Sequence, residues 1–248
     1  MKRLFLLTLV LYLSSVAFAQ TDNGLILSAG LTHKFGKKFS LDGEVEMRTR
    51  NDFKTMDRWT VEVDANYKLL KYLKASAGYS LLVDNNQEKI SFDEESIDEP
   101  VITKWRPSYW GLRHRFNVSF IGSVDAGRFS FSLRERWQYT YRPETDQDLY
   151  DFNMESWDKK PVFGSGKSVL RSRLQVEYNI KKSKFTPFAN VELYNAWSVE
   201  KIRYSVGAEW KMTKQQQLTL FYRYQQINKE GDDEPDINQF GIGYNFKF

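Results

Sequence analysis

Four pairs of arginines, each separated by a single residue, are the most distinctive chemical feature of this sequence. In a β-strand, side chains two residues apart point to the same face, so each pair would present two guanidinium groups side by side. Arginine stays ionised and offers planar, bidentate donors, which suit carboxylates and other anions. The pairs are Arg48 and Arg50, Arg113 and Arg115, Arg134 and Arg136, and Arg171 and Arg173.

The opposite faces of the same segments are apolar. Beside Arg113 and Arg115, for example, the alternate positions hold Leu112, Phe116 and Val118. A strand with one strongly charged and one apolar face requires two different solvents. A membrane-spanning barrel provides them, with lipid outside and a polar lumen inside.

Period-two alternation recurs along most of the chain, in segments near the length that a tilted membrane-spanning strand requires. The sequence therefore predicts an all-β fold, a transmembrane antiparallel up-and-down β-barrel of about 10–12 strands. An odd number of strands would place the two termini on opposite sides, whereas bacterial barrels usually have an even number, so the strand number stays open. The segments are 24–35, 38–50, 58–69, 72–84, 110–122, 128–141, 168–181, 184–196, 200–212, 216–227 and 236–248.

The N-terminus has the pattern of a secretory signal peptide. Lys2 and Arg3 precede an almost entirely apolar run over residues 4–16, and Ala17-Phe18-Ala19 forms a small-residue cleavage site. We expect residues 1–19 to be removed and residues 20–248 to form a barrel in the outer membrane. An uncleaved N-terminal anchor is the alternative, which the shortness of the apolar run disfavours.

Composition excludes several other classes of site and partner. The chain contains no cysteine, so disulfides, thiolate metal sites and a lipoprotein anchor are excluded. Loss of Lys2 and Arg3 lowers the formal net charge from +4 to +2, which is too small to indicate nucleic-acid binding. We expect no cofactor and no metal.

The connections between the segments indicate an orientation. Short connections are basic, such as 36–38 and 181–184, and the longer ones at 85–109, 143–167 and 228–235 are mostly acidic. Short and long connections are expected to alternate strictly, as periplasmic turns and extracellular loops do. The acidic loops are therefore predicted to lie outside the cell.

Aromatic residues on the apolar faces favour a membrane barrel over a soluble, lipocalin-like one, because they gather near strand ends as interfacial belts do. The C-terminal segment alternates up to a terminal aromatic, Phe248, a pattern that suits the machinery which assembles outer-membrane barrels. The belt residues are Phe35, Phe39, Trp59, Trp110, Phe120, Phe129, Trp137, Tyr139, Phe185, Trp210, Tyr222 and Tyr224.

Several short stretches together resemble a known family. Because these stretches occur in a fixed order, nearly all of residues 24–248 resembles domain-of-unknown-function family 2490. Members of this family are predicted to be outer-membrane β-barrels. The resemblance implies a barrel in the outer membrane and supplies no activity, substrate or site residues. The stretches are Arg48-Thr49-Arg50, Gly78-Tyr79-Ser80, 112–116, Leu133-Arg134-Glu135-Arg136 and 187–193.

Placing the apolar faces outward predicts a network of charges in the lumen. Two interpretations stay open: a structural network in which carboxylates, including Glu192 and Glu209, pair with the arginines, or a constriction that attracts small anions. The predicted members are Glu44, Glu46, Arg48, Arg50, Glu62, Asp64, Arg113, Arg115, Arg134, Arg136, Arg171 and Arg173.

One polar pair is predicted on the lipid-facing side. If Phe120 pairs with Phe129 across a 121–128 connection, His114 lies directly opposite Glu135, and each can satisfy the other in lipid. Some lipid hydrolases need a serine, a histidine and an acid on such a face. Here Ser172 falls beyond Glu135, so the acid would separate the histidine from the serine.

These patterns lead to three hypotheses for function. The first is a narrow passive pore with an arginine-lined lumen. The second is a non-conducting structural or surface-binding barrel, whose acidic loops contact divalent ions, lipopolysaccharide or a partner. A hydrolase on the lipid face is a remote third, and we do not expect an enzyme.

Overall fold

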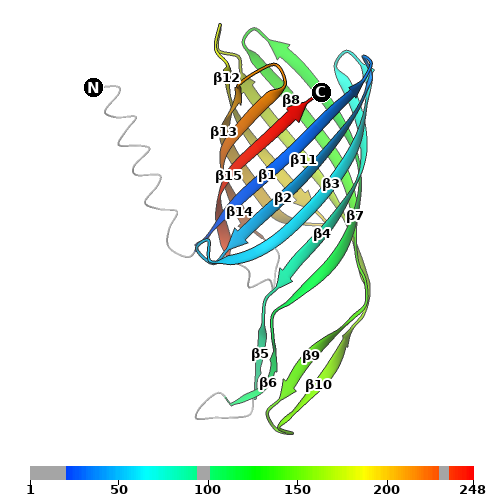
Figure 1. Ribbon diagram of the computed structural model, residues 1–248, viewed down its shortest axis with the longest axis vertical. Coiled ribbons are helices and arrows are strands. Elements are labelled where there is room, and N and C mark those ends of the chain that lie inside the picture. The colour runs from blue at the N-terminus through cyan, green and yellow to red at the C-terminus, as the bar shows by residue number, and fades with distance from the viewer. Residues whose placement is uncertain (1–20, 94–100, 229–234) are drawn as a thin grey trace, which may run out of the picture.

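The computed structural model describes residues 21–93, 101–228 and 235–248. The predicted signal peptide, residues 1–19, lies outside this part of the chain. Among the described residues, no helix is long and apolar enough to cross a membrane. Eleven strands form a closed barrel (Figure 1). They are β1 (Thr21–Phe35), β2 (Phe39–Arg50), β3 (Thr55–Leu70), β4 (Leu73–Asn86), β7 (Tyr109–Ala126), β8 (Phe129–Arg142), β11 (Ser165–Tyr178), β12 (Phe185–Asn195), β13 (Val199–Lys211), β14 (Gln216–Ile227) and β15 (Asp236–Lys247).

The barrel closes through a parallel pair. β1 and β15 run in the same direction, from Thr21 opposite Asp236 to Thr32 opposite Lys247, while the other neighbours in the barrel are antiparallel. An odd number of up-and-down strands leaves the first and last strands pointing the same way, so only a parallel ladder can join them. The predicted barrel of about 10–12 strands is confirmed, and the strand number that the sequence left open is eleven, one for each predicted segment.

The distribution of polarity is inverted relative to a water-soluble domain. Ser80 and Ser119 are completely buried inside the barrel and Asn117 is 2% exposed. On the outer wall, Leu133 and Val206 are more than half exposed. Alternation along each strand sends the polar residues inward and the apolar ones outward, as a lipid-facing wall requires.

Aromatic residues stand on this outer wall, as the alternation predicts. Phe35, Trp110 and Phe185 each leave roughly half of their surface exposed. Phe185 and Trp210 stack across β12 and β13 with ring centroids 5.6 Å apart. Amphipathic rings of this kind suit the interface between hydrocarbon and water.

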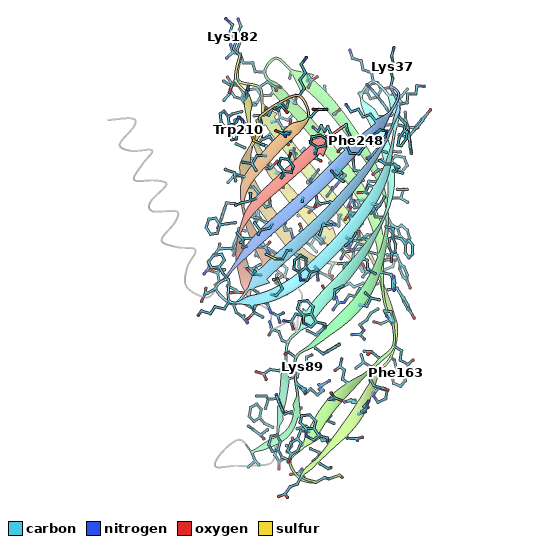
Figure 2. The ribbon with its side chains drawn as sticks, in the orientation of Figure 1. Lys37, Lys89, Phe163, Lys182, Trp210 and Phe248 are labelled. Atoms are coloured by element: carbon cyan, nitrogen blue, oxygen red, sulfur yellow. The ribbon has the colours of Figure 1, made fainter. Side chains whose placement is uncertain are left out.

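Two of the connections contain a second sheet that the sequence analysis missed. Its strands are β5 (Lys89–Phe92), β6 (Ile102–Arg106), β9 (Thr145–Asp151) and β10 (Ser156–Val162), in the order β10-β9-β6-β5. Figure 1 shows this sheet beyond one end of the barrel, and Figure 2 places Lys89 and Phe163 there. The segments 85–109 and 143–167 are therefore not simple loops.

An aromatic cluster accounts for the association of these short strands. The register places Trp105 opposite Tyr150 and Tyr150 opposite Trp157, so the three side chains share one face. The ring centroids of Trp105 and Trp157 lie 5.8 Å apart, and those of Tyr150 and Trp157 lie 5.2 Å apart. Cross-strand aromatic pairs stabilise a sheet that is too small to have a core of its own.

The predicted strict alternation of short and long connections is also wrong. At the end of the barrel that carries the second sheet, β2 and β3 are joined by only residues 51–54, and β12 and β13 by residues 196–198. The acidic residues of segments 94–100 and 229–234 lie outside the described residues. Lys37 and Lys182 mark the opposite end, where the turns are short (Figure 2).

The register between β7 and β8 differs from the predicted one by six residues. β7 continues to Ala126, which pairs with Phe129, so the turn consists of Gly127 and Arg128 alone. Gly127 has a φ of 65°, which suits a tight two-residue hairpin. Phe120 consequently lies opposite Glu135, and the predicted 121–128 connection is wrong.

Parallel closure can be tested with engineered cysteines, because the chain has none of its own. Ala29 and Tyr244 are partners across β1 and β15, and neighbouring strands about 4.8 Å apart allow a disulfide. We expect the A29C/Y244C variant to crosslink within one chain on oxidation, as measured by gel mobility before and after reduction. The A29C/F240C control, displaced by about 13 Å along the strand, should not crosslink. Crosslinking of the control alone would contradict this closure.

Candidate functional site

The lumen of the barrel contains a cavity of about 820 Å³. All of the predicted charged residues line it except Arg50 and the predicted partner Glu209. Arg50 lies at the end of β2 and pairs instead with Asp57, with Nη1 3.2 Å from Oδ1. The alternation of the strands therefore gave the correct inward direction for eleven of the twelve predicted members of the network.

Glu192 on β12 is the centre of the arginine-rich part of the lumen. Its carboxylate accepts hydrogen bonds from Nη2 of Arg171, at 3.0 Å to each oxygen, and from Arg134. The hydroxyl of Tyr194 also donates to it, at 3.1 Å. Glu192 is only 6% exposed, so these charge-assisted bonds replace the water that the carboxylate loses on burial. We call Glu192, Arg134, Arg171 and Tyr194 the Glu192 cluster.

Tyr194 lies between two arginines. The guanidinium carbon of Arg171 is 4.6 Å from the ring centroid, and that of Arg203 is 4.7 Å from it. Arg203 also donates to the Tyr194 hydroxyl and, through Nε, to Gln225 at 2.7 Å. The ring thereby holds two cations in place without neutralising either of them.

A second ion cluster involves an acid that the sequence analysis did not name. Asp84 on β4 pairs with Arg58 and with Nε of Arg113, the latter at 2.9 Å. Asp84 is 5% exposed. It occupies an inward position of the predicted segment 72–84, so the same alternation that identified Arg113 could have identified Asp84.

Four carboxylates form an acidic wall on β2 and β3. Asp42 lies opposite Asp64, and Glu44 lies opposite Glu62, so like charges face each other across both pairs. Such pairs are destabilising unless other groups compensate them. Arg136 reaches from β8 to both Glu62, at 3.4 Å, and Asp64, at 3.6 Å.

Neutral donors complete the compensation of three of these acids. Ser80 donates to Glu62 at 3.0 Å, Asn66 donates to Asp42 at 2.8 Å, and Asn117 donates to Asp64 at 3.3 Å. Within the described part of the chain, Glu44 makes no ion pair, and its side chain is exposed to the cavity.

Several lumen arginines also lack a carboxylate partner. Counted over the described residues, no acid lies within 4 Å of the guanidinium groups of Arg115, Arg173, Arg203 or Arg223. The pattern of paired arginines does not single out Arg203 and Arg223, because each occurs singly in the sequence. Thirteen arginines and lysines line the cavity against seven acids, an excess of six positive charges. The lumen is far more basic than the formal charge of the chain suggests.

The predicted pair of His114 and Glu135 is not formed. The corrected register places His114 opposite Tyr141, and Nδ1 of His114 lies 2.8 Å from the hydroxyl of Tyr79 on β4. Glu135 instead accepts a hydrogen bond from Ser172 on β11 at 2.6 Å. Ser172 thus contacts Glu135 across the ladder of β8 and β11, whereas His114 contacts Tyr79 across the ladder of β4 and β7.

None of these residues forms a recognisable metal centre. Among the described residues, no group of three or more histidine, aspartate and glutamate side chains has a geometry that could hold a metal ion. Arginine donors dominate the lining of the lumen instead, and such planar donors suit carboxylates and other anions.

The Glu192 cluster gives a prediction about stability. Replacing Glu192 by Gln leaves Arg134 and Arg171 buried without a counter-charge, which should destabilise the barrel by about 3 kcal/mol. Denaturant unfolding in detergent, followed by tryptophan fluorescence, measures this change. Glu44→Gln is the matched control and should change the free energy of unfolding by less than about 0.5 kcal/mol. Equal effects of the two substitutions would show that the cluster does not stabilise the fold.

The lipid-face contacts give a second prediction. In a double-mutant cycle, Glu135→Gln and Ser172→Ala should couple by about 1 kcal/mol, because they remove the same hydrogen bond. Glu135→Gln and His114→Ala should be additive, because six residues of register separate these positions by roughly 20 Å. Thermal unfolding of the single and double variants gives both coupling energies. Coupling of Glu135 to His114 rather than to Ser172 would contradict the observed register.

Comparison with known proteins agrees with the resemblance noted from sequence. Among solved structures, the chain is similar to NanC porin, with 16% identity and a TM-score of 0.49, over 92% of this chain and 99% of that one. It is also similar to the outer-membrane protease OmpT from Escherichia coli, with 12% identity and a TM-score of 0.36, over 84% and 80% of the two chains. A search of curated proteins found no match. The family described as "Protein of unknown function (DUF2490)" matches residues 23–235, and the chain belongs to that family.

Proposed function

We propose that the protein is an outer-membrane barrel that acts as a narrow passive pore for small anionic solutes. The closed ladder and the apolar outer wall support a position in the membrane, since a spanning sheet must have no free edge in lipid. The signal-peptide pattern in residues 1–19 supports export to the outer membrane. On this proposal, the short basic turns face the periplasm and the second sheet faces outward.

The excess of positive charge around the cavity is the observation that carries the proposal. Charges confined in a narrow passage with low-dielectric walls create a potential that concentrates counter-ions. A purely structural network would match its arginines with carboxylates, as Glu192 and Asp84 do. The arginines without such partners, including Arg173 and Arg223, are the ones that we assign to solute attraction.

The second sheet favours one alternative, a barrel that binds a partner at the cell surface without conducting. Trp157 on β10 leaves 59% of its surface exposed, and Phe92 on β5 leaves 50% exposed. Exposed apolar groups gathered outside a barrel are a feature of contact surfaces. A purified protein that never conducts, at any voltage, would support this alternative over the pore.

We further propose that the protein has no enzymatic activity and needs no cofactor. The geometry of the lipid face supports this, because Ser172 and Glu135 bind each other while His114 binds Tyr79. Acyl transfer would require the histidine between the serine and the acid.

Conductance across a planar bilayer tests the pore. We expect anion-selective current steps in a salt gradient, with selectivity that weakens at high salt because the charges become screened. The R173Q/R223Q variant removes two lumen charges without breaking an ion pair, and its reversal potential should shift toward cation selectivity by about threefold in permeability ratio. The K89Q/K159Q variant removes two charges from the second sheet and should leave the reversal potential unchanged. Identical reversal potentials for all three proteins would rule out selection by the lumen.

A further inference from the structure

The main concentrations of acidic and basic side chains in the lumen lie on opposite walls, and Arg48 and Arg58 on the acidic side pair with Glu46 and Asp84. In the strand order of the barrel, β12 is five strands from β3 in one direction and five strands from β2 in the other. β12 therefore stands diametrically across the lumen from the acidic wall of Asp42, Glu44, Glu62 and Asp64. The strands that flank β12 carry Arg171, Arg173 and Arg203, which with Arg134 we call the arginine wall.

The two walls also lie at a common depth. Arg136 contacts Glu62 and Asp64 of the acidic wall. In the ladder between β8 and β11, Arg136 is the direct partner of Arg171, which binds Glu192. One arginine thus connects the level of the acids to the level of the Glu192 cluster.

Each wall keeps charge that the other residues of the lumen do not neutralise. Across the residues that the structure describes, Glu44 has no basic side chain within 4 Å, and Arg173 and Arg203 have no acid within that distance. All three line the same cavity of about 820 Å³. An electric field consequently runs across the lumen, from the arginine wall to the acidic wall.

We propose that this lumen selects small zwitterionic solutes, which carry a carboxylate or similar anion together with an ammonium group. This inference rests on the proposed pore function and refines its substrate class, because a zwitterion carries the anionic group that the arginines attract together with a cationic one. A simple anion interacts favourably with the arginine wall only and is repelled by Glu44. A zwitterion can orient across the field, with its anion toward Arg173 and Arg203 and its ammonium group toward Glu44 and its neighbours.

Flux through liposomes that contain the full-length protein tests this selection. Swelling rates are compared in isotonic 4-aminobutyric acid, a zwitterion, and in erythritol, a neutral solute of similar size. Neither solute has a net charge, so neither builds up a membrane potential. We expect the zwitterion to enter about fivefold faster than erythritol, the order of effect of one charge pair at contact distance in water.

Variants assign the effect to the acidic wall. The E44Q/E62Q/D64N variant should bring the ratio of the two rates to about one. Its matched control, D146N/D148N/D158N, removes three carboxylates from the second sheet and should keep the native ratio. Glu44→Gln alone removes a side chain that makes no ion pair, so it should fold normally and lower the ratio, should the triple variant fail to assemble.

The outcomes separate this inference from the pore itself. Anion-selective conductance, combined with equal rates for the two solutes, would overturn the zwitterion selection and leave the pore standing. A native ratio that Glu44→Gln does not change would also overturn it. Absence of both conductance and erythritol entry would overturn the pore, and the inferred substrate class with it.

Discussion

The need to satisfy every backbone hydrogen bond in hydrocarbon is the constraint on which the rest of the structure depends. A sheet can meet it only by closing on itself, because a free edge would leave N–H and C=O groups without partners. With eleven strands, closure takes the form of the parallel ladder between β1 and β15. This ladder fixes the circumference of the barrel, and so decides which strands stand opposite each other across the lumen. The separation of β12 from β2 and β3 is a direct consequence of it.

Confinement of the arginines creates the second constraint. Guanidinium groups on adjacent strands repel one another, and β8 and β11 place Arg134 opposite Arg173 and Arg136 opposite Arg171. Glu192, with two arginines and a tyrosine bound to one carboxylate, compensates part of this repulsion. Tyr194 contributes through its ring face, which attracts cations without removing their charge. The lumen therefore keeps a positive charge although part of the repulsion between its arginines is compensated.

Ion-paired arginines and arginines without an acid in contact share the same lumen, counted over the described residues. The buried ion pairs of Glu192 and Asp84 hold arginine side chains against the wall, whereas Arg173 and Arg223 face the cavity without an acid in contact, among the described residues. The structural network and the solute pathway were alternatives from the sequence. In the barrel, paired and unpaired arginines occupy neighbouring inward positions of the same strand, as Arg171 and Arg173 do on β11, because alternation sends every second side chain inward whether or not it finds a partner.

The sequence by itself determined the features that follow from period-two alternation. These are the fold class, the eleven barrel segments, and the direction of single side chains, inward for Arg134 and Glu62 and outward for Trp110. These are local properties, since each strand sorts its own side chains between lipid and lumen. Register, partners across the lumen and the second sheet were decided only by the tertiary structure. Gly122 and Gly127 both suit a turn, and only the pairing of Ala126 with Phe129 shows which of them forms it, so His114 and Glu135 were wrongly paired. The contact from Arg136 to Glu62 joins residues 74 positions apart, and no local pattern encodes a distance across a barrel whose circumference depends on how the whole chain closes.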